Sequence, residues 1–375
     1  MAFKGVTVLD IGSYAISVLA GERGVNNTFS VKGQAVKHYE GFAEGKFFDE
    51  HDLETAIGEA LNEIADVIGG VSPEIYVSVP GVFVDLENKK YKISLGKPRK
   101  IRQKDVDCLL NEGKLKVESE GFEVIGCSEI YFALDDNRRV VNPVGVVSSL
   151  LGGAITYYSC DKKFTSLLRR ILLKHKIKDV KFVFVGQAEG EYLLKREERE
   201  FPSLIIDVGY ITSELTLHLG NGILAECCED FGGGYLTFYM LRDFGLSVKD
   251  AESLKREINF AHSLSSNSVY TIFTDDGEVQ FPCETVNEIA LDAVDSFVGL
   301  ISDFIEENAS PFAENLRIYL TGGGLSYLRG VKSHLSARLG LPVEILAPKV
   351  PMHNKPDESS TFAMLNFALK DKENR

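Results

Sequence analysis

Asp10-Ile-Gly-Ser13 ends the first apolar run of the chain, and related turns follow two later runs as Asp207-Val-Gly-Tyr210 and Thr321-Gly-Gly-Gly324. One Asp-x-Gly turn alone more often closes a hairpin or caps a helix. The ordered set of three, however, predicts phosphate-binding turns in two halves of the chain. The runs before the turns are rich in β-branched residues and predict buried strands: Val6-Thr-Val-Leu9, Leu204-Ile-Ile206 and Ile318-Tyr-Leu320.

The chemistry of these turns suits a nucleotide with a divalent cation. A glycine just after a buried strand lets the backbone approach an anion with no side chain in between. An aspartate at the end of a strand can hold the water shell of Mg²⁺, and Asp10 and Asp207 are placed for this role. We therefore expect one nucleotide between the two halves of the chain.

The composition narrows the classes of protein that remain. With 375 residues, 44% of them apolar and 26% charged, the chain is long enough for two or three globular domains. A net charge of −14 argues against nucleic acid as the main partner, because phosphate binding needs clustered lysine and arginine. The densest basic stretch, Lys97-Pro-Arg-Lys-Ile-Arg-Gln-Lys104, is interpreted as a solvated loop beside a strand.

The cysteines and the N-terminus indicate a cytoplasmic protein. The six cysteines show no Cys-x-x-Cys pair and no histidine at ligand spacing, so they are typical of reduced thiols. The chain enters its first strand without a leader segment, and no apolar run approaches the ~20 residues that span a bilayer.

Strand and helix patterns alternate at the start and again after an insertion. Between about residues 82 and 164 the alternation of strand and helix patterns gives way to short strand patterns around one helix pattern, Lys104–Ser119. This change predicts a small α+β insertion. Its strands are predicted at Tyr91–Leu95, Phe122–Tyr131 and Ala154–Ser159. Outside it, we predict helices at Leu53–Ile68, Lys163–His175, 235–263, 285–308 and Gly330–Leu339, strands at Val180–Val185 and 316–320, and a final helix with a frayed end at Lys370–Arg375.

Several motifs occur together in one order along nearly the whole chain. They are Leu9-Asp-Ile-Gly-Ser13, Asn142-Pro-Val-Gly145 inside the insertion, Asp207-Val-Gly209 with its hairpin, Phe231-Gly-Gly233, Ala251-Glu-x-x-Lys255 and Thr321-Gly-Gly-Gly324. This order resembles FtsA, the bacterial cell-division protein of the actin superfamily, and the placement of the insertion is its most specific part.

The resemblance implies an actin-like (ribonuclease H-like) two-lobed α/β fold, in which the α+β insertion is an SHS2-like 1C subdomain. The implied bounds are 1–81 and 165–200 for subdomain 1A, 82–164 for 1C, 201–230 and 288–347 for 2A, 231–287 for 2B, and 348–375 for a closing helix and tail.

Carried over position by position, the resemblance implies an ATP site with Mg²⁺. Gly12 and Ser13 would meet the β- and γ-phosphates from the first half, and Gly209 and Thr212 would meet them from the second. Asp10 and Asp207 would hold the hydrated Mg²⁺. The remaining implied positions are Glu252 and Lys255 at the ribose and adenine, Gly232 and Gly233, and Gly322, Gly323 and Gly324 against the adenosine.

Departures from the family pattern occur at positions that would act on the phosphates and the attacking water, and not at the positions implied for the adenosine. Ala15 stands where the family has a lysine, and Val185-Gly-Gln187-Ala188 replaces Glu-Pro-x-Ala, whose glutamate is suited to positioning water. Gln187 and Glu189 are the candidates to replace that glutamate. We therefore expect ATP to be bound and hydrolysis to be slow or absent.

The second turn departs as well. Tyr210 and Ile211 replace two glycines, and Glu214 replaces an aspartate. Two interpretations of Tyr210 remain open: it packs over the turn, or it fills the γ-phosphate site.

The resemblance also implies partners. They are copies of the chain itself, meeting through the insertion, and the C-terminal tail of the tubulin-like FtsZ, docking on 231–287. The family's amphipathic membrane helix is not matched, because Thr361–Leu369 is interpreted as the closing helix of the core. We expect a cytoplasmic protein that reaches the membrane only indirectly, at the division site.

Two other functions stay open. A PilM-like adaptor, which grips a short cytoplasmic peptide of a pilus protein, has the same fold and also lacks a terminal membrane helix. A sugar or acetate kinase of the same superfamily would need a catalytic residue facing an acceptor site, and no such site is recognisable in the sequence.

Overall fold

The computed structural model describes residues 3, 5–25, 28–117, 119–261, 268–275 and 277–375. The chain forms two compact units. The first contains residues 1–203, 216–226 and 360–375, and the second contains 204–215 and 227–359. No helix in the described ranges is long and apolar enough to cross a bilayer.

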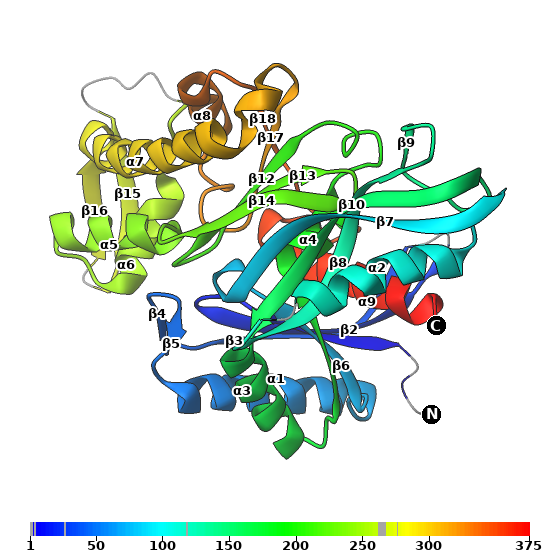
Figure 1. The fold of residues 1–375 in the computed structure, drawn as a ribbon. Helices are drawn as coiled ribbons and strands as arrows, with labels where there is room; N and C mark the ends of the chain where they lie inside the picture. The colour runs from blue at the N-terminus through cyan, green and yellow to red at the C-terminus, as the bar shows by residue number, and fades with distance from the viewer. Residues whose placement is uncertain (1–2, 4, 26–27, 118, 262–267, 276) are drawn as a thin grey trace. The chain divides into compact units, whose positions relative to one another are not determined.

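The first unit is built on a sheet in the order β11-β6-β1-β2-β3 (Figure 1). Strand β1 (Val6–Ile11) is buried along its whole length, as its apolar sequence predicts, and pairs antiparallel with β2 (Ala15–Arg23) and parallel with β6 (Glu74–Val79). The outer strands are β3 (Phe29–His38) beside β2 and β11 (Asp179–Phe184) beside β6. The first turn therefore lies at the carboxyl end of a buried central strand. A small hairpin, β4 (Phe42–Ala43) and β5 (Lys46–Phe47), follows β3.

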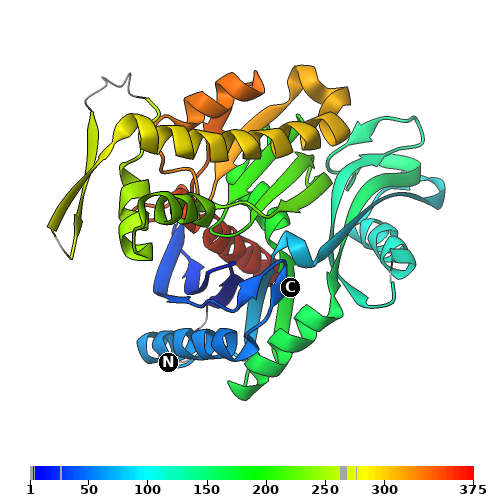
Figure 2. The ribbon, with the colours of Figure 1, turned by 90° about the vertical axis from the view of Figure 1, so that its left-hand side faces the viewer.

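Helix α1 (Glu50–Ile68) covers one face of this sheet (Figure 2). Asp49 caps it by accepting hydrogen bonds from the N–H groups of His51 and Asp52, and Gly69 ends it at φ +76°. Its buried residues recur at helical spacing from Leu53 to Ile64, whereas Val67 is 62% exposed. That exposure follows from its place on the last turn. Helices α3 (Lys162–Lys174) and α4 (Val185–Leu193) flank β11 in sequence.

The insertion forms its own sheet, in the order β7-β10-β8-β9, packed against helix α2 (Gln103–Val117). The three predicted strands are present, and each extends further than predicted: β7 spans Val84–Lys100, β8 Phe122–Ala133 and β10 Val147–Asp161. A short strand, β9 (Arg139–Val140), was not predicted. The basic stretch was predicted as a loop, but Lys97–Lys100 lies within β7.

The long pairing with β10 explains why β7 extends so far. Tyr91, Ile93 and Leu95 pack into the core of the insertion, while Lys92 and Ser94 between them are exposed. Apolar spacing marks only this central part, whereas pairing with β10 runs from Val84 to Ser94 and resumes, after a break in register, at Arg99 and Lys100.

The second unit is built around the sheet β14-β13-β12-β17-β18. Strands β12 (Ser203–Val208) and β17 (Arg317–Thr321) end in the second and third turns, and β18 (Val343–Ile345) pairs parallel with β17. The hairpin of β13 (Ser213–Leu219) and β14 (Gly222–Glu229) has its outer part, 216–226, in the first unit. The remaining elements are α5 (Gly233–Phe244), α6 (Val248–Glu257), β15 (Val269–Thr274), β16 (Gly277–Pro282), α7 (Cys283–Ala309) and α8 (Val331–Leu339).

Helix α9 (Ser359–Glu373) closes the core of the first unit, as predicted. Phe362 and Leu365 are fully buried, and a Cβ on Gly21 of β2 would lie 3.0 Å from the Leu365 side chain. The predicted frayed end was wrong. Lys372 donates to the carbonyl of Gly5, and Arg375 forms an ion pair with Glu74. These long-range partners are invisible in a charged C-terminal sequence.

Shortening a buried side chain near the end of α9 tests whether this end packs on the core of the first unit. We expect Leu369→Ala to lower the free energy of unfolding by about 2 kcal/mol, because Leu369 is 5% exposed and its loss leaves a cavity. The neighbouring Lys370→Ala, at an exposed ion pair with Glu191, should change stability by less than about 1 kcal/mol. Urea unfolding followed by circular dichroism measures both. Equal stability of Leu369→Ala and the parent would mean that the end is frayed after all.

Glu226 on β14 makes stability depend on pH. Burial, together with the charge of Asp85 on β7, raises the pKa of Glu226 to about 7. At pH values between the ordinary carboxyl pKa of about 4.3 and this raised value, Glu226 is protonated in the folded state and ionised in the unfolded state. The contribution of Glu226 to folding stability is therefore full below about pH 4.3 and is lost as pH rises through about 7. Glu226→Gln should therefore stabilise the protein by about 1–3 kcal/mol at pH 8 and leave it unchanged at pH 4. Unfolding at the two pH values decides this, with the exposed Glu120→Gln as a control. The same difference at both pH values would contradict it.

Candidate functional site

The first turn is closed by its own backbone. The N–H of Gly12 donates to the carbonyl of Ala15 at 3.0 Å, and the Tyr39 hydroxyl donates to the carbonyl of Gly12 at 2.6 Å. Ser13 and Tyr14 thus form the tip of a two-residue hairpin after β1. Because the Gly12 N–H is already engaged, what Gly12 offers a phosphate is the lack of a side chain rather than a donor.

Asp10 is tied to the closing helix. Its Oδ2 accepts hydrogen bonds from the hydroxyls of Ser360 at 2.6 Å and Thr361 at 2.8 Å, and the residue is 8% exposed. These two donors at the start of α9 hold the carboxylate in one orientation at the end of β1. Sequence reasoning missed them, although the Ser359-Ser-Thr361 run before an apolar segment is a helix-start signal.

The second turn, in the other unit, is closed by a backbone hydrogen bond of the same kind, and the start of α5 packs against it. The N–H of Gly209 donates to the carbonyl of Thr212 at 3.0 Å. The carbonyls of Gly209 and Tyr210 then accept hydrogen bonds from Gly233 at 2.9 Å and Gly234 at 2.7 Å, at the start of α5. A Cβ on Gly232 would lie 2.4 Å from the Tyr210 carbonyl oxygen. The start of α5 therefore packs backbone to backbone against the turn.

The third turn interlocks with the second. Gly322 has φ +79°, and a Cβ there would lie 2.1 Å from Oδ1 of Asp207. The N–H of Gly324 donates to the carbonyl of Val208 at 2.7 Å, and a Cβ on Gly324 would lie 2.3 Å from the Gly209 carbonyl oxygen. Close approach within the chain itself thus already requires glycine at these two positions.

Gly323 differs from its neighbours. A Cβ there would meet a single side chain, that of Asp357, at 3.0 Å. The carboxylate of Asp357 in turn accepts a hydrogen bond from the hydroxyl of Tyr327, which is half exposed. Of the three glycines, Gly323 is therefore the position where added bulk disturbs the turn least.

Glu252 and Lys255 of α6 form a largely buried ion pair beside these turns. The Lys255 ammonium donates to Oε2 of Glu252 at 2.8 Å and to the carbonyl of Gly233 at 3.2 Å. The hydroxyl of Thr237 donates to the same Glu252 oxygen at 2.7 Å. Thr237 was not predicted, yet it lies one helical turn after Gly233 on α5. The pair joins α5 to α6.

Burial and pairing act in opposite directions on this pair. Burial lowers the pKa of Lys255, and the hydrogen bond to Glu252 restores it only in part. Burial also raises the pKa of Glu252, but the bond and charge of Lys255 outweigh this, so its pKa lies below the ordinary range. The hydrogen bond between the two groups thus offsets part of the effect of burial on Lys255 and outweighs it on Glu252.

Tyr210 packs over the start of α5. A Cβ on Gly234 would lie 3.0 Å from the Tyr210 ring, and the Lys255 ammonium lies 5.7 Å from its centroid. A cation at this distance from an aromatic face is attracted to it. The ring thus borders the Glu252–Lys255 pair.

The candidate catalytic residues lie on α4 in the first unit. Gln187 is 7% exposed, and its amide donates to Oε1 of Glu191 at 3.3 Å. Its Oε1 lies 3.5 Å from where a Cβ on Gly126 of β8 would be. Glu189 is 2% exposed. Both side chains are held inside the unit. Within the described residues, no group of three or more His, Cys, Asp or Glu side chains is placed to hold a metal ion.

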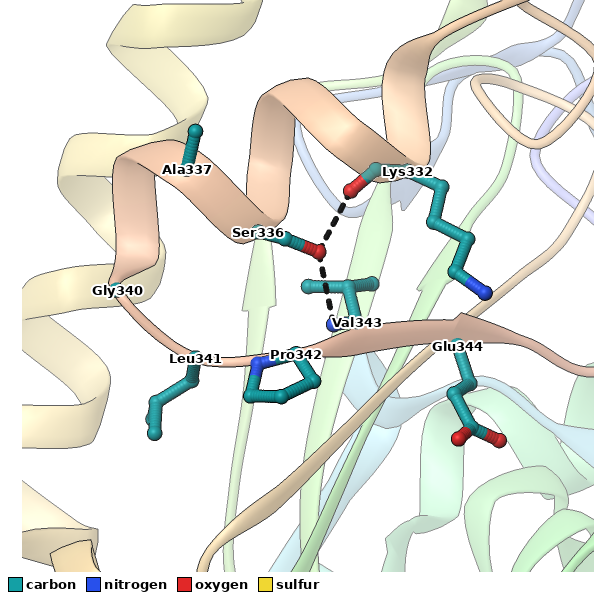
Figure 3. A pocket seen from close by; sticks show the side chains of 8 residues that line it. All are labelled: Lys332, Ser336, Ala337, Gly340, Leu341, Pro342, Val343 and Glu344. Atoms are coloured by element: carbon teal, nitrogen blue, oxygen red, sulfur yellow. Dashed lines mark hydrogen bonds between the residues drawn. The ribbon is translucent and has the colours of Figure 1, made fainter.

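A separate surface pocket lies between α8 and β18 of the second unit (Figure 3). None of the residues predicted to bind a nucleotide lines it. The hydroxyl of Ser336 links α8 to β18 in this pocket. It accepts a hydrogen bond from the N–H of Val343 at 3.0 Å and donates one to the carbonyl of Lys332. Leu341 and Pro342 form one wall, and Lys332 and Glu344 stand at its edge.

The sequence is similar to known proteins in its insertion and along most of its length. Residues 81–158 match a family model described as the SHS2 domain inserted in FTSA. The cell division protein FtsA of Buchnera aphidicola subsp. Baizongia pistaciae is 18% identical over 357 residues, which covers 92% of this chain and 84% of that protein. The match to the insertion thus falls inside an alignment over nearly the whole chain.

Solved structures show the fold. The PilM-PilN type IV pilus biogenesis complex has a TM-score of 0.65 at 15% identity and covers 98% of this chain and 99% of that one. MreB 5 of Spiroplasma citri bound to AMPPNP has a TM-score of 0.59 at 12% identity, covering 100% and 99%. At such identities the likeness concerns the fold alone. The predicted actin-like fold with an SHS2-like insertion is confirmed, and the sequence is similar to FtsA, at low identity, over nearly the whole chain.

Proposed function

We propose that this protein is an ATP-binding cytoskeletal adaptor of bacterial cell division, acting at the division site on the cytoplasmic side of the membrane. The observation that carries this proposal is the FtsA-type insertion within a chain that aligns with FtsA over nine tenths of its length. The adaptor binds partners and assembles with copies of itself, rather than turning over a metabolite.

The nucleotide site of this proposal uses the three turns. Asp10 and Asp207 hold Mg²⁺ through water, the first two turns contact the phosphates, and Glu252 and Lys255 contact ribose and base. A relative of this fold, MreB 5, has been solved with AMPPNP, which supports an ATP-like ligand here. The glycine N–H groups that close the turns are engaged, so phosphate contacts fall to the turn tips and to the Mg²⁺ ion. Hydrolysis is slow or absent, since Gln187 is bonded to Glu191 rather than free to orient water.

Tyr210 makes the nucleotide proposal testable through a gain of affinity. We expect Tyr210→Gly to bind ATP with Mg²⁺ about tenfold more tightly than the parent, because it removes a ring that covers Lys255 and Gly234. Isothermal titration with ATP and ADP measures this, and phosphate release measures turnover. Tighter binding without turnover would support a nucleotide-gated adaptor.

The control is Gly323→Trp, which places a large side chain at the middle glycine of the third turn, where a Cβ avoids the backbone clashes found at Gly322 and Gly324. It should abolish binding while the protein stays folded. If neither the parent nor Tyr210→Gly binds ATP or ADP, the fold serves here as a scaffold only.

The proposed partners are copies of this chain, meeting through the insertion, and the FtsZ C-terminal tail on 231–287. A synthetic FtsZ-tail peptide should bind the full chain in fluorescence anisotropy, and ATP should promote sedimenting assemblies. A peptide that shows no binding at millimolar concentration would remove FtsZ as a partner.

A second candidate is a PilM-like adaptor that binds a short peptide of a pilus protein. Full-length likeness to the PilM-PilN complex favours it. Binding of a PilN-type N-terminal peptide, with no binding of the FtsZ tail, would decide for this alternative.

A further inference from the structure

One end of the insertion combines exposed aliphatic and cationic side chains. We call it the tip surface and define it by Lys97, Lys100, Arg102, Val141, Val144 and Val147. Strands β7 and β10 meet here, with Val147 opposite Lys100, and α2 begins just after Arg102 (Figure 1). All of these residues belong to the first unit, so their arrangement is that of one compact body.

Backbone hydrogen bonds hold the apolar turn directly beside the cations. The N–H of Ile101 donates to the carbonyl of Val146 at 2.8 Å, and the N–H of Gly145 donates to the carbonyl of Ile101 at 2.9 Å. Within the turn, the N–H of Val144 donates to Oδ1 of Asn142 at 3.0 Å. Ile101 is itself buried, so Lys100 and Arg102 are anchored on either side of a core residue.

The valines of the tip surface are more exposed than their residue type usually is. Val141 is 40% exposed, Val144 41% and Val147 55%. Single exposed valines are common on protein surfaces. Three within seven residues, on a hydrogen-bonded turn, form instead a compact apolar patch at one end of the sheet.

The cations of the tip surface are not neutralised. Lys97, Lys100 and Arg102 are exposed and form no ion pair with any residue that the structure describes. The acidic groups nearby are already engaged. Asp105 pairs with Arg99 at 2.7 Å and Asp136 pairs with Arg138 at 2.5 Å. Asp135 accepts hydrogen bonds from Ser149, which orient its carboxylate without cancelling its charge, so three cations face one such carboxylate. A net positive surface thus persists on a chain whose net charge is −14.

We propose that the tip surface docks on an anionic lipid bilayer. Aliphatic side chains that can enter the acyl boundary, flanked by lysine and arginine that can reach headgroup phosphates, are the chemistry of interfacial membrane binding. An acidic peptide would use the cations, but it gives no reason for three valines on a turn rather than in a groove. The contact is direct, in contrast to the indirect membrane association expected from the sequence, and it needs no nucleotide.

Vesicle co-sedimentation tests this with the full chain and without nucleotide. The protein should pellet with phosphatidylcholine vesicles that contain 30% phosphatidylglycerol, and 500 mM salt should release it. The triple variant Lys97→Gln, Lys100→Gln, Arg102→Gln should partition about 100-fold more weakly, at roughly fivefold per lost charge. Val144→Ser with Val147→Ser should reduce partitioning about tenfold without changing its salt dependence.

A matched control removes three cations of the first unit that lie outside the insertion, by Lys46→Gln, Lys176→Gln and Lys178→Gln. This variant should pellet within about twofold of the parent, since the tip surface is unchanged. Thermal unfolding of each variant shows that the fold is kept.

Three results would overturn the proposal. They are no binding of the parent to anionic vesicles at 50 mM salt, equal binding to pure phosphatidylcholine, and equal loss in the control and tip variants. Retention of an oligoglutamate peptide by the tip surface without vesicle binding would assign the cations to an acidic protein partner instead. ATP titration of the same samples reports on the proposed function separately.

Discussion

Gly322→Ala should destabilise the second unit by about 2–5 kcal/mol. Gly322 has φ +79°, a conformation that costs an L-residue about 1–2 kcal/mol. The new Cβ would also lie 2.1 Å from Oδ1 of Asp207 and 2.4 Å from the carbonyl oxygen of Val208, and forcing these groups apart adds about 1–3 kcal/mol. Urea unfolding, followed by tyrosine fluorescence and circular dichroism, measures the loss.

Gly299→Ala in α7 is the matched control. A Cβ there has nothing within 4 Å, so the same chemical change inside a helix should stabilise the protein by about 0.5–1 kcal/mol. If Gly322→Ala is as stable as the parent, the second and third turns do not interlock as described. The glycine would then be required only for a ligand.

Lys255→Met should cost about 3 kcal/mol, because removing one partner of a largely buried ion pair leaves the other charge without compensation. Glu252 and the carbonyl of Gly233 both lose a donor in this variant. The double variant with Glu252→Gln should recover most of the loss, because no unpaired charge remains. Thermal and urea unfolding of the two variants and the parent measure this coupling.

Lys249→Met, on the same helix, is the control for Lys255→Met. Its ion pair with Asp275 is exposed on both sides and should contribute less than about 1 kcal/mol. The effect of Lys255→Met should also depend on pH. The pKa of Glu252 is lowered in the folded state, so the stabilisation is present above the ordinary carboxyl pKa and is lost as pH falls through the folded value. A loss that stays constant down to pH 3 would show that packing, not charge, is responsible.

These predictions bear on how the proposed ATP site is built. In the second unit, the glycines at the start of α5 and in the third turn bring three backbone segments together before any ligand arrives. A scaffold that has lost its nucleotide would still need these glycines for its own packing. The binding experiment on Tyr210→Gly therefore carries more information about function than the presence of the glycine turns.

The sequence by itself determined the features that depend on neighbours along the chain. The apolar runs before Asp10, Asp207 and Thr321 predicted buried strands, and these are β1, β12 and β17. The helical spacing of Leu53–Ile68 predicted most of α1, and the change of texture near residue 82 predicted the insertion. Local hydrophobic period and turn residues are sufficient for such predictions.

Only the tertiary structure decided what each of these features contacts. Asp10 bonds Ser360, 350 positions away, and Gly322 is pressed against Asp207 rather than open to a ligand. Strand β7 runs on to Lys100 because Arg99 and Lys100 pair with β10. The turn that carries the exposed valines lies beside Lys100 and Arg102 because Ile101 is hydrogen-bonded to Gly145 and Val146. Such contacts join segments that are distant in the chain, so no short-range pattern encodes them. They exist only when the buried strands have brought those segments together.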